Sequence, residues 1–401
     1  MQDAVRELVD RGLKIPAPST VYVAPEVTCD RIADDVSLHP GCRISGEDTS
    51  IGPGSELGAE GAVVLDNCQL GAGVSLKGGF FSHAVFLDGV QMGSCAQVRS
   101  GTLMEEEASA AHGVGFKQTI LMPFVTAGSL INLCDCIMAG GVDRSHHSEI
   151  GSCYVHFNFT PQGDKATASL MGDVPRGVML DQAPVFLGGQ GGLVGPVQVE
   201  YGTVLAAGSV HRHDITTPNH LVMSPPNQQM DQPYDMTVYP RMEQRVIKNL
   251  VYIGNLLALK TWYLHVRKPF MSGDRFGQAC YEGALKALGR VIAERIQRLG
   301  QLATKAERSL GGLRAGDAAA DDIVAHETLL ESWPAMEAQL AELEDGIPGA
   351  PPPASLAEAL GSSDQGYIET IRALGEDVRC SGTAWLQDLV NASAALWQSK
   401  S

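Results

Sequence analysis

The sequence lacks the features that would attach it to a membrane or to a nucleic acid. No apolar run in its 401 residues is long enough to span a bilayer, and the first residues lack the basic segment and apolar core of a secretory signal. Basic residues are scarce: 29 Lys and Arg stand against 46 Asp and Glu, a formal net charge of −17. Because nucleic acids and anionic lipids need clustered cations, neither is expected as a partner. We expect a cytoplasmic protein.

Paired cysteines are also missing. The nine cysteines include no Cys-x-x-Cys motif, and the two that lie closest in sequence are Cys134 and Cys136. Two thiols are too few for a structural zinc site. We therefore expect reduced, buried thiols and no bound metal.

A repeat of six residues is the strongest pattern that the sequence does contain. Aliphatic residues recur at every sixth position at Leu187, Leu193, Val199 and Leu205, at Ile32, Leu38 and Ile44, at Ile51 and Leu57, at Leu70 and Leu76, and at Met92 and Val98. This period fits neither a helix nor simple strand alternation. It is typical of short strands joined by tight turns, whose coils stack on one another, and the 45 glycines ease such turns. The pattern predicts a parallel β-helix from about Ile32 to Val210.

The segments that flank the repeats have other patterns. Val5 to Leu13 predicts a short amphipathic helix, and apolar residues at helical spacing recur from Met242 onward. In that region we expect Pro334 to interrupt a helix and Ser355 to cap the next one. The predicted organisation is an N-terminal helix and linker (1–19), a β-helix (20–215), a linker or arm (216–240) and an α-helical domain (241–401).

The repeats resemble the left-handed β-helix of hexapeptide-repeat acyltransferases. More specifically, residues 5–215 resemble the acetyltransferase part of bifunctional N-acetylglucosamine-1-phosphate uridyltransferase/glucosamine-1-phosphate acetyltransferases. The similarity lies in residues 11–13 with 20–27, in 150–159 with 171–174, and in 185–210. The uridyltransferase domain of that family would have to precede residue 1, so we expect no pyrophosphorylase activity. The family does not share the helical C-terminal extension.

Arg99 and Lys117 are the best candidates for binding a substrate. They are eighteen positions apart, which is three six-residue faces, so they should stack on adjacent coils. Both match basic residues that hold the sugar phosphate in the resembled family. Arg offers a bidentate fork and Lys a point charge, a suitable pair for phosphate. The structural alternative is two solvated surface cations.

The resemblance implies a histidine that acts as general base, since imidazole titrates near neutral pH. His146, in the stretch Ser145 to Gly151, resembles the family's His-x-Ser-x-x-Gly pattern. Glu149 stands where the family has Tyr, and His146 is about half as far from Asn158 as the family pattern requires. The alternative candidates for the base are His147, His112 and His156. These histidines are equally well read as surface or hydrogen-bonded residues.

The resemblance also implies sites for the acyl donor, acetyl-coenzyme A. Asn158, Gly189 and Ala207 match positions that line the pantetheine groove, and Gly189 and Ala207 are again eighteen apart. Phe159 replaces a family Tyr, and Lys165 loosely matches a Lys on the substrate side. Small residues are what the fold itself needs at Gly189 and Ala207, so this signal is weak on its own.

Together these patterns predict an acyl-coenzyme A-dependent acyltransferase that acts on a phosphorylated or nucleotide-linked amino sugar. A catalytically silent module that binds sugar nucleotides, or a scaffold, is the alternative. The γ-type carbonic anhydrases share the fold, but their His-x4-His pair is absent from this sequence. Because proteins of this fold are usually trimers with active sites between prisms, we expect a homotrimer.

Overall fold

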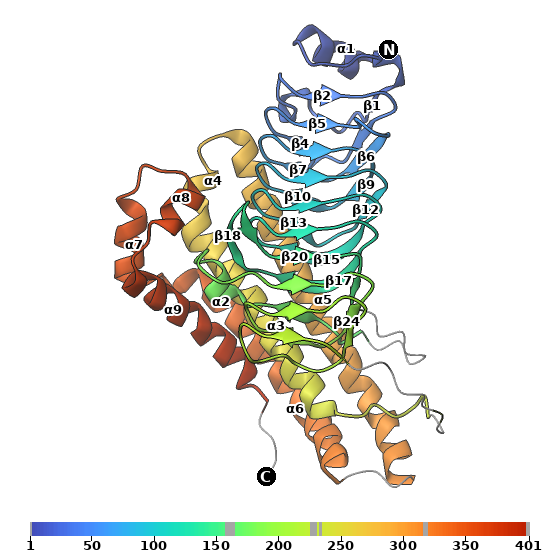
Figure 1. The fold of residues 1–401 in the computed structure, drawn as a ribbon, viewed down its shortest axis with the longest axis vertical. Coiled ribbons are helices and arrows are strands. Elements are labelled where there is room, and N and C mark those ends of the chain that lie inside the picture. Colours follow the sequence, from blue (N-terminus) through green and yellow to red (C-terminus); the bar gives the residue numbers. More distant parts are fainter. Residues whose placement is uncertain (1, 157–164, 225–230, 232–234, 316–319, 398–401) are drawn as a thin grey trace.

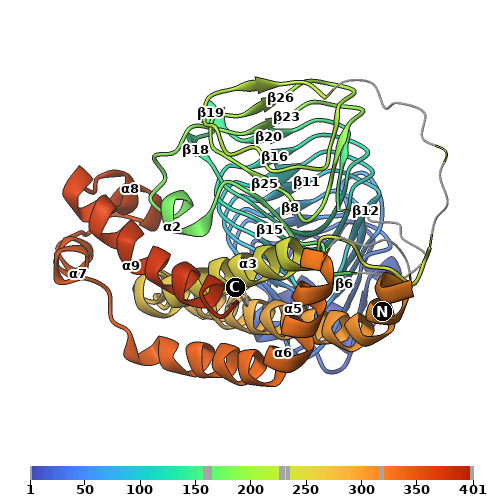
Figure 2. The same cartoon turned by 90° about the horizontal axis from the view of Figure 1, so that it is seen from below.

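The chain forms a stack of parallel β-coils with two layers of helices along one side (Figures 1 and 2). This computed structural model describes residues 2–156, 165–224, 231, 235–315 and 320–397. Most strands are only two to four residues long, and all of those described except β18 and β19 pair in parallel with a strand one coil away. The predicted parallel β-helix is thus confirmed, and its short strands are consistent with the left-handed form.

The strands line up in three faces. Face 1 contains β1 (Tyr22–Val23), β3 (Arg43–Ser45), β6 (Val63–Asp66), β9 (Gly79–Ser82), β12 (Ala96–Val98), the first halves of β15 (Gly115–Leu121) and β17 (Asn132–Met138), β21 (Tyr154–His156), β24 (Gly192–Val194) and β27 (Val210–His211). Face 2 contains β4 (Ser50–Ile51), β7 (Gln69–Leu70), β10 (Ala84–Phe86), β13 (Thr102–Met104), the second halves of β15 and β17, β22 (Ser169–Met171) and β25 (Gln198–Val199).

Face 3 completes the triangle, and a small ladder leaves the stack between faces 2 and 3. Face 3 contains β2 (Ser37–Leu38), β5 (Glu56–Leu57), β8 (Ser75–Leu76), β11 (Gln91–Met92), β14 (Ser109–Ala110), β16 (Thr126–Ala127), β20 (Glu149–Ile150), β23 (Phe186–Leu187), β26 (Val204–Leu205) and β28 (Leu221–Val222). The ladder pairs β18 (Gly141–Asp143) with β19 (His146–His147) in antiparallel orientation. Because β28 pairs with β26, the stack extends past its predicted end at residue 215.

The six-residue repeat forms the inner core of the stack. The repeat positions that the sequence singles out, from Ile32 to Leu205, are each at most 3% exposed. On face 3 the residue before each of them is mostly polar and at least partly exposed, as at Glu56 and Gln91. The alternation expected of a strand with one buried side therefore holds on this face.

Face 2 departs from that alternation because its outer side is apolar as well. Val85, Leu103, Ile120, Ile137 and Leu170 occupy equivalent positions on successive coils. They alternate with inward residues such as Phe86 and Met104, so they point out of the stack, yet none is more than 3% exposed. We call these five side chains the outer apolar stripe. Helices cover it.

The helices form two layers over face 2. In the first, α5 (Arg275–Ala315) packs on β4, β7, β10 and β13, and α3 (Met242–Trp262) packs beside it. In the second, α6 (Ala320–Gly346) packs on α5, and α9 (Glu376–Ala394) packs on α3. The remaining helices are α1 (Asp3–Asp10) at the N-terminal end of the stack, α2 (Val174–Gly177), α4 (Lys268–Met271), α7 (Ala354–Gly361) and α8 (Tyr367–Arg372).

Two expectations about helix boundaries were wrong. Helix α6 runs through Pro334 without a break. Ser355 lies inside α7, which begins one residue earlier with Pro353 as its N-cap. In both places packing against neighbouring helices outweighs the local signal, as is common for helix propensities.

A buried charged cluster joins the coils to the helices near one end of α3. The Tyr263 hydroxyl donates a 2.6 Å hydrogen bond to Glu105, and Arg267, fully buried, pairs with Glu106 and lies over the Tyr367 ring. Burial raises the pKa of Glu105 to about 7, Arg267 lowers it, and Glu106 raises it further. The carboxyl group of Glu105 therefore keeps its proton in the folded state at pH values where it would lose it in water.

This raised pKa predicts a specific pH dependence of stability. The stabilising contribution of protonated Glu105 is complete below its ordinary pKa of 4.5 and is lost as the pH rises through about 7. The free energy of unfolding of Glu105→Gln, relative to wild type, should therefore increase by about 1–3 kcal/mol between pH 5 and pH 8. Urea denaturation at both pH values measures this difference. The exposed Glu358→Gln is the control, and a Glu105→Gln difference that stays constant with pH would contradict the assignment.

Candidate functional site

The corner between faces 1 and 2 brings the predicted phosphate residues together. Gln97 pairs with Gly115 and Val98 with Phe116, and the Arg99 amide donates to the Phe116 carbonyl at 2.8 Å. Arg99, directly after β12, and Lys117, within β15, therefore occupy equivalent positions on adjacent coils. Both side chains are exposed, and neither forms an ion pair with a carboxylate in the described part of the chain. The Arg99 guanidinium lies 4.9 Å from the centre of the Phe80 ring, one coil away.

Helix α5 holds this corner from the side of face 2. Arg290 donates to the Ser100 hydroxyl at 2.8 Å. Arg295 is 2% exposed; it donates to the Gln118 amide oxygen at 2.9 Å and pairs with Asp135 at 3.0 Å. Ser100 lies in a turn at this corner, whereas Gln118 and Asp135 lie within β15 and β17, at the points of positive φ (+48° and +54°) where each strand turns the corner. Helix α5 therefore binds three successive coils. Sequence reasoning missed both arginines, because nothing local marks a helix residue more than 150 positions away as a partner of these turns.

Lys165 joins the same cationic region. Its carbonyl accepts a 3.2 Å hydrogen bond from Arg295, and its side chain is exposed. Burial raises the pKa of the nearby Cys134 thiol to about 11, with a further increase from Asp135 and opposing effects from Lys117, Arg295 and Lys165. The structure thus gathers Arg99, Lys117 and Lys165 at one corner, and it leaves Cys134 protonated and unreactive at neutral pH.

A cavity of about 690 Å³ lies on face 1 next to this corner. Among the residues that the structure describes, no Asp, Glu, Lys, Arg or His belongs to its lining. The described lining is Cys95, Gln97, Gly113, Val114, Gly115, Leu130, Ile131, Asn132, Ser152, Cys153, Tyr154, Gln190 and Gly191. It reaches from the strands of face 1 to the opposite corner, between faces 3 and 1. Its size is that of a small-molecule site.

Of the candidate bases, His112 lies beside this cavity and His146 does not. His112 precedes Gly113 at the corner between faces 3 and 1, and its Nδ1 is 3.0 Å from the Ser129 hydroxyl. His146 and His147 belong to the antiparallel ladder between faces 2 and 3, and Glu149 lies on face 3. Within one chain these three residues are therefore separated from Arg99 and Lys117. His156 ends a strand of face 1.

The positions predicted for coenzyme A fall partly within the described structure. Phe186 pairs with Val204 and Leu187 with Leu205, which places Gly189 and Ala207 at the same level of adjacent coils. Both lie at the corner between faces 3 and 1, next to Gln190 and Gly191 of the cavity. A Cβ at Gly151, one coil away, would come within 2.6 Å of the Gly189 amide. Asn158 and Phe159 lie outside the described residues.

Three further observations concern metal binding, membrane insertion and disulfide bonds. No group of three or more His, Cys, Asp or Glu side chains lies close enough together there to hold a metal ion. None of the helices described is both long and apolar enough to cross a membrane. All nine cysteines have free thiols.

The chain is similar to curated proteins of one kind over about half its length. It is 28% identical over 205 residues to bifunctional protein GlmU of Geotalea uraniireducens (strain Rf4), covering 51% of this chain and 40% of that protein. It is 26% identical over 211 residues to bifunctional protein GlmU of Thermotoga sp. (strain RQ2), covering 53% and 42%. The chain thus spans about two fifths of the length of these relatives. No family model matches it.

Solved structures give weaker likenesses. LpxA from Acinetobacter baumannii is 15% identical with a TM-score of 0.22, covering 53% of this chain and 71% of that one. The polysialic acid O-acetyltransferase OatWY is 13% identical with a TM-score of 0.17, covering 56% and 90%. The similarity in sequence to GlmU and the β-helix described above confirm the predicted resemblance to a hexapeptide-repeat protein of the GlmU kind.

Arg295 offers a test of how α5 holds the corner. Replacing it with Met removes a buried cation from Asp135 and Gln118, which should lower the free energy of unfolding by about 3 kcal/mol. Arg290→Ala, which removes only an exposed hydrogen bond, should cost less than about 1 kcal/mol. Urea denaturation of both variants compares them. Equal losses would mean that Arg295 is no more important to the corner than a surface residue.

Proposed function

We propose that the chain transfers an acyl group from an acyl-coenzyme A to an amino sugar that carries a phosphate or a nucleotide, and that the reaction takes place on face 1. The observation that carries this proposal is the cavity between two stacked cations and a histidine. Arg99 and Lys117 lie at one end of face 1, and His112 lies at the other. The similarity to GlmU supports the same class of reaction.

The length of face 1 suits such an acceptor. His112 and Lys117 lie on one coil, five residues apart. The bend at Gly113 (φ +69°) shortens this span, and the extended stretch from Val114 to Lys117 covers roughly 10 Å. The side chains of His112 and Lys117 can each extend several ångströms toward the other across face 1, which leaves room for a sugar between them. The phosphate would bind the guanidinium of Arg99 and the ammonium of Lys117, with Lys165 adding charge at the same corner.

The proposed chemistry is direct transfer with His112 as general base. In the tautomer whose Nδ1 donates to the Ser129 hydroxyl, 3.0 Å away, His112 presents a basic Nε2. This nitrogen takes a proton from the acceptor amine as the amine attacks the thioester carbonyl. A C–N bond forms, the C–S bond breaks, and the proton passes to the departing thiolate. The acyl donor, acetyl-coenzyme A in the simplest case, would lie along the corner of Gly189 and Ala207.

The phosphate residues give the first test of this proposal. Arg99→Ala and Lys117→Ala should each raise the KM for the acceptor about tenfold, because each removes a charge-assisted hydrogen bond. Acetylated product is detected by mass spectrometry with acetyl-coenzyme A and a panel of amino-sugar phosphates and nucleotide sugars. Arg43→Ala, an exposed arginine in a distant coil of face 1, is the matched control. Kinetics unchanged by Arg99→Ala and Lys117→Ala would remove both residues from the site.

The base is tested separately. His112→Ala should lower kcat by about 10²- to 10⁴-fold, the usual contribution of a general base, and His146→Ala should leave it unchanged. If His146→Ala abolishes turnover instead, the base is His146, supplied across an interface by a second copy of the chain.

A catalytically silent binding module is the second candidate function. It is favoured by the place of His146, the residue most similar to the family base, on the far side of the stack. Sugar nucleotides that raise the Tm while no product forms across the panel would support it. The homotrimer stays a prediction, and the helices over face 2 leave faces 1 and 3 for such contacts.

A further inference from the structure

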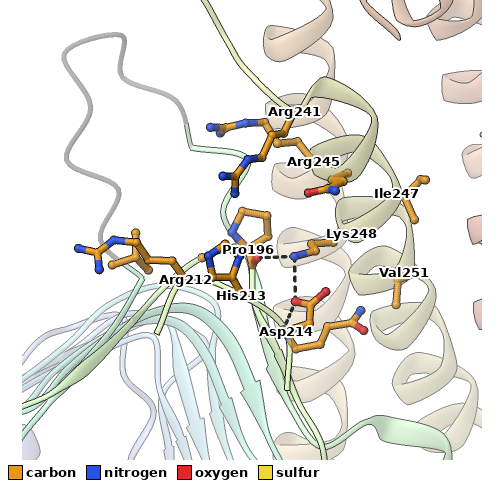
Figure 3. Close-up of a pocket in the computed structure, with 13 residues that line it drawn as sticks. Pro196, Arg212, His213, Asp214, Arg241, Arg245, Ile247, Lys248 and Val251 are labelled. Carbon is orange, nitrogen blue, oxygen red and sulfur yellow. Dashed lines mark hydrogen bonds and ion pairs between the residues drawn. The ribbon is translucent and has the colours of Figure 1, made fainter. Parts of the chain in front are cut away.

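A second cavity lies at the junction of the last coils with α3, away from the candidate site. Figure 3 shows its lining, which comes from residues 194–198 and 212–214 of the stack and from residues 241–251 of the helical region. Its volume is about 510 Å³, within the range of small-molecule sites. It lies at the corner between faces 1 and 2, whereas the cavity of the proposed acyl transfer opens toward the corner between faces 3 and 1.

The lining of this cavity is basic in an acidic protein. Arg212, Arg241, Arg245 and Lys248 contribute four cationic side chains, and among the described residues Asp214 is the single acid in the lining. The chain as a whole has 46 acidic and 29 basic residues. Such a concentration of positive charge is costly without counter-charges, because like charges repel at short range.

Asp214 is already engaged. It accepts a 2.8 Å bond from Lys248 and a 2.9 Å bond from the Gln198 amide. Lys248 also donates to the Pro196 carbonyl at 3.1 Å. Arg212 and Arg241 are exposed, and neither side chain forms an ion pair among the described residues. The Arg241 backbone amide donates to the Asp322 carboxylate at 3.0 Å. The cavity therefore has positive charge that the described protein groups do not neutralise.

Two of these cations, Arg241 and Arg245, come from the start of α3. Arg241 has φ +58°, a left-handed conformation that is uncommon for a residue with a long side chain, and it directly precedes α3. Arg245 follows one helical turn later, and its Nε donates to the Pro240 carbonyl at 3.0 Å. In Figure 3 the side chains of Arg241 and Arg245 extend in the same direction from the start of α3, above Pro196.

We propose that this cavity, which we call the junction cavity, binds a small molecule that carries a phosphate or diphosphate group. Guanidinium groups offer the planar pairs of donors that phosphate oxygens accept, and several of them around one cavity suit a multiply charged anion. The net charge of −17 repels extended polyanions, so a small ligand fits better than a nucleic acid. The helical region thereby gains a binding role of its own.

The test uses the full chain, with inorganic pyrophosphate and ADP as probes in isothermal titration calorimetry. The double variant Arg212→Gln/Arg241→Gln should weaken binding of either probe about tenfold or more, because it removes two charged hydrogen-bond donors. Neither side chain forms an ion pair with a described carboxylate, so the substitutions leave no such carboxylate without its partner. Asp214→Asn should strengthen binding, because it removes the single acid and releases Lys248. Arg6→Gln, an exposed arginine in α1 at the far end of the stack, should leave binding unchanged.

The two sites of the chain can be told apart in the same experiment. If the Arg99→Ala/Lys117→Ala variant loses probe binding and the Arg212→Gln/Arg241→Gln variant keeps it, the proposal that the junction cavity binds phosphate is wrong. The proposed acyl transfer is unaffected by that result. Absence of binding to the wild-type chain would overturn the proposal for the junction cavity as well. Binding lost only in the junction variant supports the proposal whether or not acyl transfer is found.

Discussion

Face 2 carries apolar side chains on both of its sides, and such a sheet is stable in water only when another layer covers it. The inner side fills the stack, and the outer apolar stripe, Val85 to Leu170, lies beneath helices. Each fully buried aliphatic side chain contributes roughly 1.5–3 kcal/mol relative to exposure. The helical region is therefore structurally part of the β-helix, and the stack would expose a continuous apolar surface without it.

This packing determines where the candidate site can form. Because α5 lies over face 2, its arginines reach the turns next to Arg99 and Lys117 and hold them through Ser100, Gln118 and Asp135. The same packing brings the start of α3 against the last coils and so creates the junction cavity. The similarity to GlmU covers only about half of the chain.

Much of the β-helix could be predicted from sequence, because the period of six residues places one aliphatic residue inward on each face. The stacking of Arg99 with Lys117, and of Gly189 with Ala207, follows from the same period, because each pair is separated by eighteen residues, or one full coil of three faces. The outer apolar stripe was also visible as the aliphatic residues Val85, Leu103 and Ile120, where faces 1 and 3 mostly have polar residues or glycine. The period of six residues does not predict this stripe, since it specifies only the inward position.

The position of the base could not be predicted in the same way. His146 matches a local pattern, but the intervening ladder of β18 and β19 carries it out of the stack between faces 2 and 3. Counting residues fails where the chain leaves the coil. His112 has no pattern to mark it, and only the corner that it shares with Ser129 brings it beside the cavity. Contacts such as Arg295 with Asp135 join distant segments and depend on how the helices pack.

The dependence of the two regions on each other is tested most directly by following unfolding in urea with two probes. The four tryptophans, at positions 262, 333, 385 and 397, all lie in the helical region, so their fluorescence reports the helices. Hydrogen exchange of amides in β10, β13 and β15, measured by mass spectrometry, reports the stack. Coincident transitions are expected if burial of face 2 joins both regions into one cooperative unit. Loss of the fluorescence signal at lower urea, with those amides still protected, would contradict that account.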